Sequence, residues 1–198
     1  MGKILNLRDV RLSFPVLGEP ERYQNKPDQP LKWSATFLIS ISDPQKALID
    51  KAIEETAVEK WAAKAKIHLS NILPDPKGCC WQDGNRKVYD GYADCFALTA
   101  HRYADKGRPL IMDNDRSPIY QADNQLYPGK AGRIFGGCYV DCQVQLWAQD
   151  NTSGKGLRAE LLVIQRRRKG DSFGGGAAPD DSAFESIEEG VDDEESLG

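Results

Sequence analysis

The sequence predicts a mainly β protein, a small barrel of five to six strands with one main α-helix. Three observations lead to this fold class. Several segments alternate apolar and polar residues, as strands with one buried face do. Residues 44–66 are the one segment that repeats its apolar residues strongly at helical spacing. The chain has 198 residues, which suits one domain with appendages better than two domains.

The first two strands are predicted at residues 5–14 and 33–41. In the first of them, alternation places Val10, Leu12 and Phe14 on the same face. The second is rich in aromatic and β-branched residues, which favour strands.

A helix is predicted directly after the second strand. Ser42 with Gln45 fits a capping box, and Pro44 suits the first helical turn. The apolar residues that then recur at helical spacing are Leu48, Ala52, Ile53, Ala57 and Trp61.

Loops and shorter strands fill much of the remaining chain. Residues 18–30, with three prolines and mixed charges, and residues 74–85 and 118–132 are predicted to be loops. A third strand is predicted at 94–102 and a short fourth strand at 109–112.

The clearest β signal is a hairpin near the end of the folded body. Residues 137–148 and 157–168 form its two strands, and 150–156 turn the chain between them. Tyr139 and Trp147 lie on its polar face. The opposite face, predicted to be buried, consists of Cys138, Val140, Cys142, Val144 and Leu146.

This order of elements favours an OB-fold, a small barrel of five strands. The predicted helix follows the second strand, whereas an OB-fold usually has its helix between the third and fourth strands. A β-sandwich is the alternative, although sandwiches seldom contain a helix of five turns.

Charge divides the chain into a basic body and an acidic tail. Residues 171–198 contain ten acidic and no basic residues, which leaves 26 basic against 20 acidic residues in residues 1–170. We therefore expect one nucleic-acid-binding domain at 1–170, followed by a flexible glycine-rich linker and acidic tail at 171–198. Charge alone would equally fit a solubilising tail on a slightly basic enzyme.

Catalytic and metal-binding patterns are weak in this sequence, so no enzyme and no cofactor are predicted. His68 and His101 are the two histidines, and no phosphate-binding loop, dinucleotide fingerprint or hydrolase motif is found. The five cysteines are expected to be reduced thiols, with a zinc site at Cys79, Cys80, Cys95 and a histidine as a minor alternative. With no apolar stretch of about 18 residues and no signal core, neither a membrane span nor secretion is expected.

The body does carry the residue types that bind single-stranded nucleic acid: cations for the phosphates and flat side chains for the bases. Basic and aromatic residues alternate in several segments. Each of these residues also has a structural interpretation, in the core or on a solvated surface. The candidate contacts are Lys32, Trp33, Arg86, Lys87, Tyr89, Arg102, Tyr103, Lys130, Arg133, Tyr139, Trp147, Arg166, Arg167 and Arg168.

Several short segments of the chain resemble one phage-encoded protein family. They are Leu12-Ser13-Phe14-Pro15, Arg108-Pro109-Leu110, Tyr127-Pro128-Gly129, Gly137-Cys138-Tyr139-Val140, Gly154-Lys155-Gly156-Leu157 and Leu161-Leu162-Val163-Ile164-Gln165. The resemblance spans most of residues 4–173. The family, long known only as a phage domain of unknown function, is similar to the single-stranded DNA-binding proteins of tailed phages. Those proteins share an OB-fold and an acidic C-terminal arm.

This resemblance implies a protein that coats single-stranded DNA without sequence preference during replication or recombination in the cytoplasm of an infected bacterium. It implies that the tail recruits a polymerase or helicase; the candidate contacts of the tail are Phe184, Asp192, Asp193, Glu194, Glu195 and Leu197. From the ten acidic residues of the tail, we also expect it to compete with DNA for the basic body. A basic body would also hold duplex DNA or RNA, and both a monomer and a homodimer fit the sequence. The alternatives are a phage assembly module that does not bind DNA, and a phage nuclease.

Overall fold

The computed structural model describes residues 2–173. The strands are β1 (Lys3–Glu21), β2 (Lys32–Ser40), β3 (Trp81–Asp83), β4 (Cys95–Tyr103), β5 (Leu110–Met112), β6 (Tyr139–Asn151) and β7 (Gly154–Arg168). The α-helices are α1 (Pro44–Trp61) and α2 (Ala65–Ile72). Short 3-10 helices are η1 (Tyr23–Asn25), η2 (Ala62–Lys64), η3 (Gly84–Arg86) and η4 (Ala104–Lys106).

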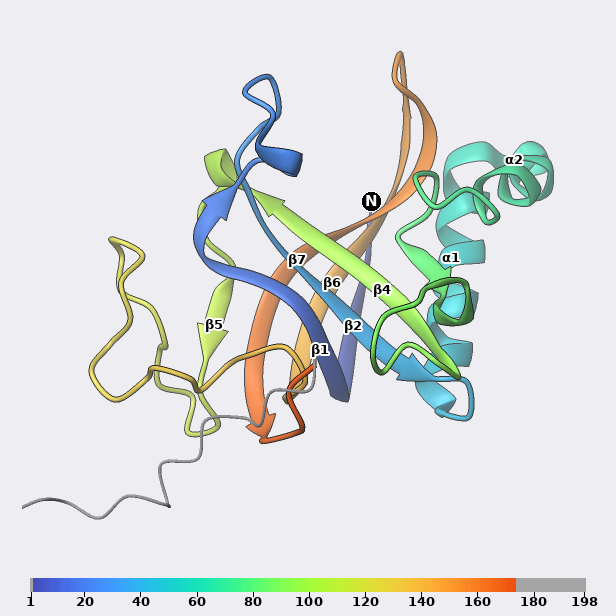
Figure 1. Ribbon diagram of the computed structural model, residues 1–198. Coiled ribbons are helices and arrows are strands. Elements are labelled where there is room, and N and C mark those ends of the chain that lie inside the picture. Colours follow the sequence, from blue (N-terminus) through green and yellow to red (C-terminus); the bar gives the residue numbers. More distant parts are fainter. Residues whose placement is uncertain (1, 174–198) are drawn as a thin grey trace, which may run out of the picture.

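Five strands close into a barrel (Figure 1). The strands pair in the order β3-β4-β2-β1-β6-β7-β5, and β4 makes an additional parallel pairing with β7. This extra pairing closes a ring of β1, β2, β4, β7 and β6, with β3 and β5 attached at its margins. The predicted fold class, a mainly β barrel with one main helix, is therefore confirmed, and α1 follows the second strand as predicted.

The strand predictions were incomplete at three places. In the hairpin, β6 continues to Asn151 and β7 begins at Gly154, so most of the turn predicted at 150–156 is strand. β1 continues to Glu21, so residues 18–21 belong to a strand and not to the predicted loop. β3 lies inside residues 74–85, which were also predicted to be loop. Its three residues pair with β4 at the margin of the sheet, and three residues are too few to show an alternation that the sequence would reveal.

Phe14 was predicted to lie on the same face as Val10 and Leu12, and this prediction is wrong. Val10 and Leu12 are buried, whereas Phe14 is 57% exposed. The pairing of β1 with β2 shifts register between Ser13 and Val16, and Phe14 has a φ angle of 45°. An extra residue in one strand reverses the alternation beyond it, which turns the Phe14 side chain outward.

The helical segment begins and ends differently from the prediction. Asp43, not Ser42, caps α1, because its carboxylate accepts a hydrogen bond from the backbone N–H of Gln45 (2.8 Å). The predicted single helix through residue 66 is broken at Ala62, which has a φ angle of 45°, and continues as α2.

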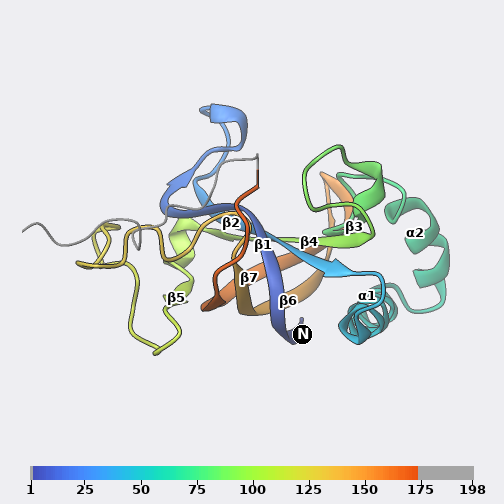
Figure 2. The same ribbon diagram turned by 60° about the horizontal axis from the view of Figure 1, so that its bottom comes forward.

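The core joins the inner face of the barrel to α1. All five residues on the predicted inner face of the hairpin are buried. In α1, Leu48 is exposed and Ile49 takes the buried position instead; the buried residues of the helix are Ile49, Ala52, Ile53, Thr56, Ala57 and Trp61. The two helices lie on one side of the barrel, and β5 with the long segment that follows it lies on the other (Figure 2).

A buried carboxylate, Asp113, fastens the segment after β5 to β7. Its oxygens accept hydrogen bonds from Lys130 (2.8 Å) and Arg133 (2.9 Å), and Arg166 of β7 lies 3.7 Å away. Burial alone would raise the pKa of Asp113, but the hydrogen bonds from Arg133 and Lys130 hold it well below its usual range. Asp113 is therefore charged at neutral pH and balances part of this cationic cluster.

We expect Asp113→Asn to lower the free energy of unfolding by about 3 kcal/mol, because it leaves three cations without their buried counter-charge. Asp115→Asn is the matched control, since Asp115 is exposed and accepts its hydrogen bonds from Ser117. Urea unfolding at pH 7 would measure both. Equal stability of the two variants would show that Asp113 is not the fastening point.

Candidate nucleic-acid interface

A groove of about 800 Å³ crosses the outer face of β2 and β4. Its floor includes Thr36 from β2 and Ala97, Thr99 and His101 from β4. Alternate residues of β4 form this floor because successive side chains of a strand point to opposite faces. The hydroxyl groups of Thr36 and Thr99 lie 3.0 Å apart across the two strands.

The groove extends across the seam where β4 meets β7. Residues 78–80 lie between these strands: Cys80 donates its backbone N–H to Leu157 O (2.9 Å), and Thr99 donates to Cys80 O (2.8 Å). Arg158 reaches the groove from β7 and is fixed by donating to Gly78 O (2.9 Å). The seam therefore adds a rigidly held guanidinium to the groove.

The groove is cationic and rimmed by aromatic rings. No aspartate or glutamate is among the described residues that line it. Its basic residues are Lys26, Lys32, Lys77, Lys87 and Arg158, and its aromatic residues are Phe14, Tyr23, Tyr89, Tyr92 and Tyr103. The segment of η1 and the β3–β4 loop bound the β2–β4 face at its two ends (Figure 1). Such a surface can hold a polyanion that also presents flat rings.

Four of the residues predicted from the sequence come together in this groove: Lys32, Lys87, Tyr89 and Tyr103. The ammonium group of Lys32 lies 5.5 Å from the centroid of the Tyr23 ring. Burial and then the charge of Arg158 lower the pKa of Lys32. A bound anion would offset both effects, because it stabilises the charged form of the amine.

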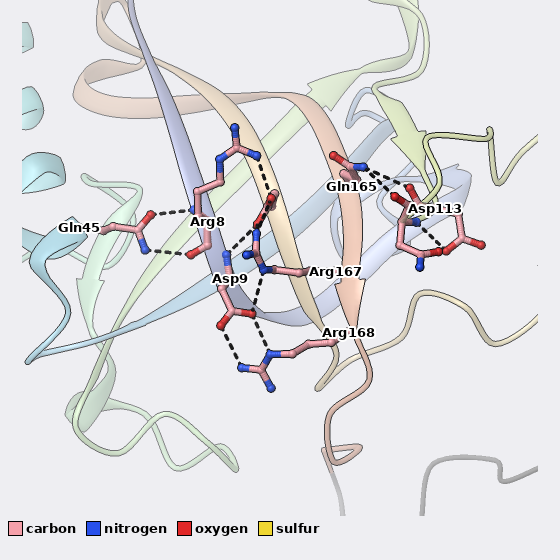
Figure 3. A network of polar contacts seen from close by, with 9 residues as sticks. Arg8, Asp9, Gln45, Asp113, Gln165, Arg167 and Arg168 are labelled. Atoms are coloured by element: carbon pink, nitrogen blue, oxygen red, sulfur yellow. Dashed lines mark hydrogen bonds and ion pairs between the residues drawn. The ribbon is translucent and has the colours of Figure 1, made fainter.

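Most other predicted cations lie elsewhere and already have anionic partners. Arg102 donates to Glu160 (2.7 Å), and Lys130 and Arg133 bind Asp113 with Arg166 nearby. Arg167 contacts Asp141 (3.0 Å), and Arg168 makes two hydrogen bonds to Asp9 (2.9 and 3.1 Å). Figure 3 shows Asp9 between Arg167 and Arg168. Arg86, next to Lys87, donates to Pro74 O (3.3 Å) and is not among the groove residues.

The three remaining aromatic candidates also lie outside the groove lining. Trp33 is buried, and its indole N–H donates to Gly18 O (2.8 Å). The guanidinium of Arg168 covers the ring of Tyr139 at 3.4 Å from the centroid. Trp147 is partly buried on β6, opposite Arg158 in the register of the hairpin. The predicted tail contacts at 184–197 fall outside the described residues.

Among the basic, aromatic and histidine residues that line the groove, the sequence interpretation missed seven: Phe14, Tyr23, Lys26, Lys77, Tyr92, His101 and Arg158. Tyr23 and Lys26 do carry the basic–aromatic signal used elsewhere, but they lie in a segment treated as a plain loop. No local pattern marks Lys77 or Arg158, because the barrel closure alone brings them to the groove.

His101 is enclosed by positive charge on the groove floor. Burial lowers its pKa to about 4, and the charges of Lys32 and Arg158 contribute in the same direction. Glu160 acts in the opposite direction, and Lys106 adds a further positive charge. His101 is therefore neutral at pH 7, and protonating it is costly in the folded protein.

We expect acid to destabilise the protein partly through His101. An unfolded histidine takes up its proton near pH 6.5, whereas folded His101 does so near pH 4, so stability is lost as pH falls between these values. Between pH 7 and pH 5 the wild type should lose about 2 kcal/mol that His101→Gln retains. Urea titrations of both proteins at the two pH values measure this difference, and parallel losses would contradict it.

All five cysteines are free thiols, and Cys79 and Cys80 lie against the groove. Within residues 2–173, no group of three or more His, Cys, Asp or Glu side chains is placed to hold a metal ion. None of the helices described is long and apolar enough to cross a membrane.

Known proteins are similar to this chain in sequence or in fold. "Putative protein p50" of Acyrthosiphon pisum secondary endosymbiont phage 1 is 37% identical over 186 residues, which cover 92% of this chain and 93% of that protein. The single-stranded DNA-binding protein of bacteriophage Enc34, solved in complex with ssDNA, has the same fold, with a TM-score of 0.69 at 24% identity over 86% of this chain and 89% of that chain.

The fold is also shared with gp2.5, a single-stranded DNA-binding protein encoded by bacteriophage T7, with a TM-score of 0.56 at 18% identity over 96% of this chain and 98% of that chain. The family model described as "Enterobacter phage Enc34, ssDNA-binding protein" matches residues 3–196. With nearly the whole chain matched, the protein belongs to the Enc34 phage ssDNA-binding protein family.

Proposed function

We propose that this protein binds single-stranded DNA, without sequence preference, along the β2–β4 groove. The observation that carries the proposal is the contrast between two sets of cations. The described residues that line the groove include cations but no aspartate or glutamate, whereas the cations at the end of β7 are paired with aspartates. An unpaired cation gains more from a phosphate than one that must first give up a carboxylate.

The aromatic residues at the rims of the groove favour binding of single-stranded DNA over duplex DNA. Tyr23, Tyr89 and Tyr103 line the groove, and Tyr23 and Tyr89 are about half exposed. Stacking of bases on such rings contributes roughly 1–3 kcal/mol per base and accepts every base. In a duplex the flat faces of the bases are covered by their neighbours, so the rings would gain little from it.

We further propose that the acidic tail, residues 171–198, competes with DNA for this groove and recruits replication proteins such as a polymerase or helicase when DNA displaces it. The position of residue 173, near the start of the tail, supports the proposed competition with DNA. Phe173 packs beside Gly91, in the loop that carries Lys87 and Tyr89. Its backbone N–H donates to Gly136 O (3.2 Å), so residue 173 is held near one end of the groove.

The biological setting follows from family membership and remains part of this proposal. The protein would coat exposed strands during phage DNA replication or recombination in the cytoplasm of the host. Its activity is binding, with no chemical step and no cofactor. Both a monomer and a homodimer are compatible with the proposal.

The contrast between the two sets of cations predicts which basic residues contribute to DNA affinity. Lys26→Gln with Lys87→Gln should weaken binding to a labelled dT oligonucleotide and reduce the slope of log affinity against log salt by roughly 1.4, because about 0.7 is lost per phosphate contact. The matched control is Arg167→Gln with Arg168→Gln, which removes the same formal charge from the carboxylate-paired cluster. Fluorescence anisotropy at several salt concentrations measures both.

Equal losses in the two double variants would show that net charge, and not the groove, governs binding. Absence of binding by the wild type at low salt would favour the alternative, an interaction module that does not bind DNA.

Truncation after Phe173 tests the tail. We expect it to raise affinity for the dT oligonucleotide several-fold at low salt and to have little effect at high salt, where attraction between opposite charges is screened. Unchanged affinity at low salt would remove the competition proposal and leave the groove proposal intact. Anisotropy of the full and truncated chains under the same conditions provides the comparison.

A further inference from the structure

The exposed ring of Phe14 lies at one end of the groove in an unfavourable backbone conformation. Its φ angle of 45° falls in the left-handed region, which bulky residues rarely adopt because Cβ crowds the backbone. Such strain persists where the surrounding structure imposes it, and it is concentrated at functional sites. Phe14 gains only partial burial in return, since the residue is 57% exposed.

A second bulge in β1 offers a comparison with Phe14, because it also contains a residue with a positive φ angle. Asp9 has a φ angle of 52°, next to a register shift between Leu7 and Val10. Its carboxylate accepts two hydrogen bonds from Arg168, so the unusual backbone conformation of Asp9 serves a polar contact. Aspartate also tolerates this conformation better than phenylalanine does. Phe14 makes no comparable polar contact with its side chain.

Neighbouring rings fix the orientation of Phe14. The Tyr89 ring meets it edge-on, with centroids 5.0 Å apart, and the Tyr92 ring lies 6.3 Å away. Tyr92 is itself held in place because its hydroxyl donates to Ser13 (3.2 Å) in the buried part of the bulge. The bulge, through Ser13 and Tyr92, thus supports the ring that it turns outward.

Phe14 and Tyr89 form a ridge between two hollows. Both line the cationic groove and also a second, more apolar hollow of about 490 Å³, bounded by Pro15, Val88 and Phe173. The described residues lining this second hollow include one acid, Asp90, and no cation, so the hollow suits a base better than a phosphate. Val88 beside the ridge is fully exposed, which extends the apolar surface.

We propose that Phe14 is a base-stacking platform: an unpaired base packs on its ring at the end of the groove, and the apolar hollow beyond the ridge receives that base. This inference rests on the proposed binding of single-stranded DNA. It assigns a DNA contact to a residue that the sequence analysis placed on the same strand face as Val10 and Leu12, which are buried. The bulge is then the device that converts a core position of β1 into a surface platform.

The test compares a dT oligonucleotide with an abasic oligonucleotide that has the same number of phosphates. Phe14→Gly removes the ring and suits a positive φ, and Phe14→Leu keeps apolar volume but has no flat face. Both should bind dT about tenfold more weakly than the wild type, the effect of losing one stacked base. Both should bind the abasic strand as the wild type does, and Phe14→Tyr should retain affinity for dT.

Two controls separate stacking from structure. Ala62 has the same φ angle of 45° and is not one of the groove residues, so Ala62→Gly relieves the same strain and should leave DNA affinity unchanged. Urea unfolding of each Phe14 variant reports whether the fold is retained. If Phe14→Gly lowers the unfolding midpoint, the comparison of Phe14→Leu with Phe14→Tyr, which keep the same backbone strain, decides the question.

The possible failures are distinguishable. Wild-type affinity for dT in Phe14→Gly and Phe14→Leu, together with weakened binding by the lysine double variant, would overturn the platform and leave the groove proposal standing. Equal losses on dT and on the abasic strand would assign Phe14 a structural role and also overturn the platform. Absence of wild-type binding to either strand would overturn both proposals.

Discussion

Closure of the barrel between β4 and β7 is the constraint on which the groove depends. The two strands meet at one parallel pair, His101 with Glu160, and the same glutamate binds Arg102 and Lys106. Residues 78–80 then join the strands where they diverge, through backbone hydrogen bonds to both. Without this seam, Arg158 on β7 would not face the floor made by β2 and β4. The groove is therefore a product of long-range topology and not of any single segment.

The fold divides its positive charges into two sets. Several arginines and lysines serve the barrel itself, because Asp9, Asp113, Asp141 and Glu160 take them as partners. The described residues that line the groove include cations but no aspartate or glutamate. A chain with a basic body can thus hold its own loops together with one set of charges and leave another set for an external polyanion. Proximity to carboxylates, more than local charge density, separates the two sets.

Much of the fold follows from the sequence, because alternation and helical spacing are local properties. The inner face of the hairpin, the second and third strands and the position of the main helix were all predicted in this way. Phe14, β3 and the break at Ala62 were not, since a bulge, a three-residue strand and a left-handed residue leave little local signal. The four arginine and lysine residues at 166–169 illustrate the limit for function: three of them find their aspartates far away in the chain, at Asp9, Asp113 and Asp141.

The central claim is that DNA lies across β2 and β4, not along the end of β7. Photocross-linking of a dT oligonucleotide that carries 5-iodouracil, followed by mass spectrometry of the linked peptides, tests it directly, because the cross-link forms with rings in contact with the base. Cross-links to the groove rings Tyr23, Tyr89 or Tyr103 are the predicted result. Cross-links confined to Tyr139 and Trp147 would place the DNA on the β6–β7 hairpin and contradict the claim.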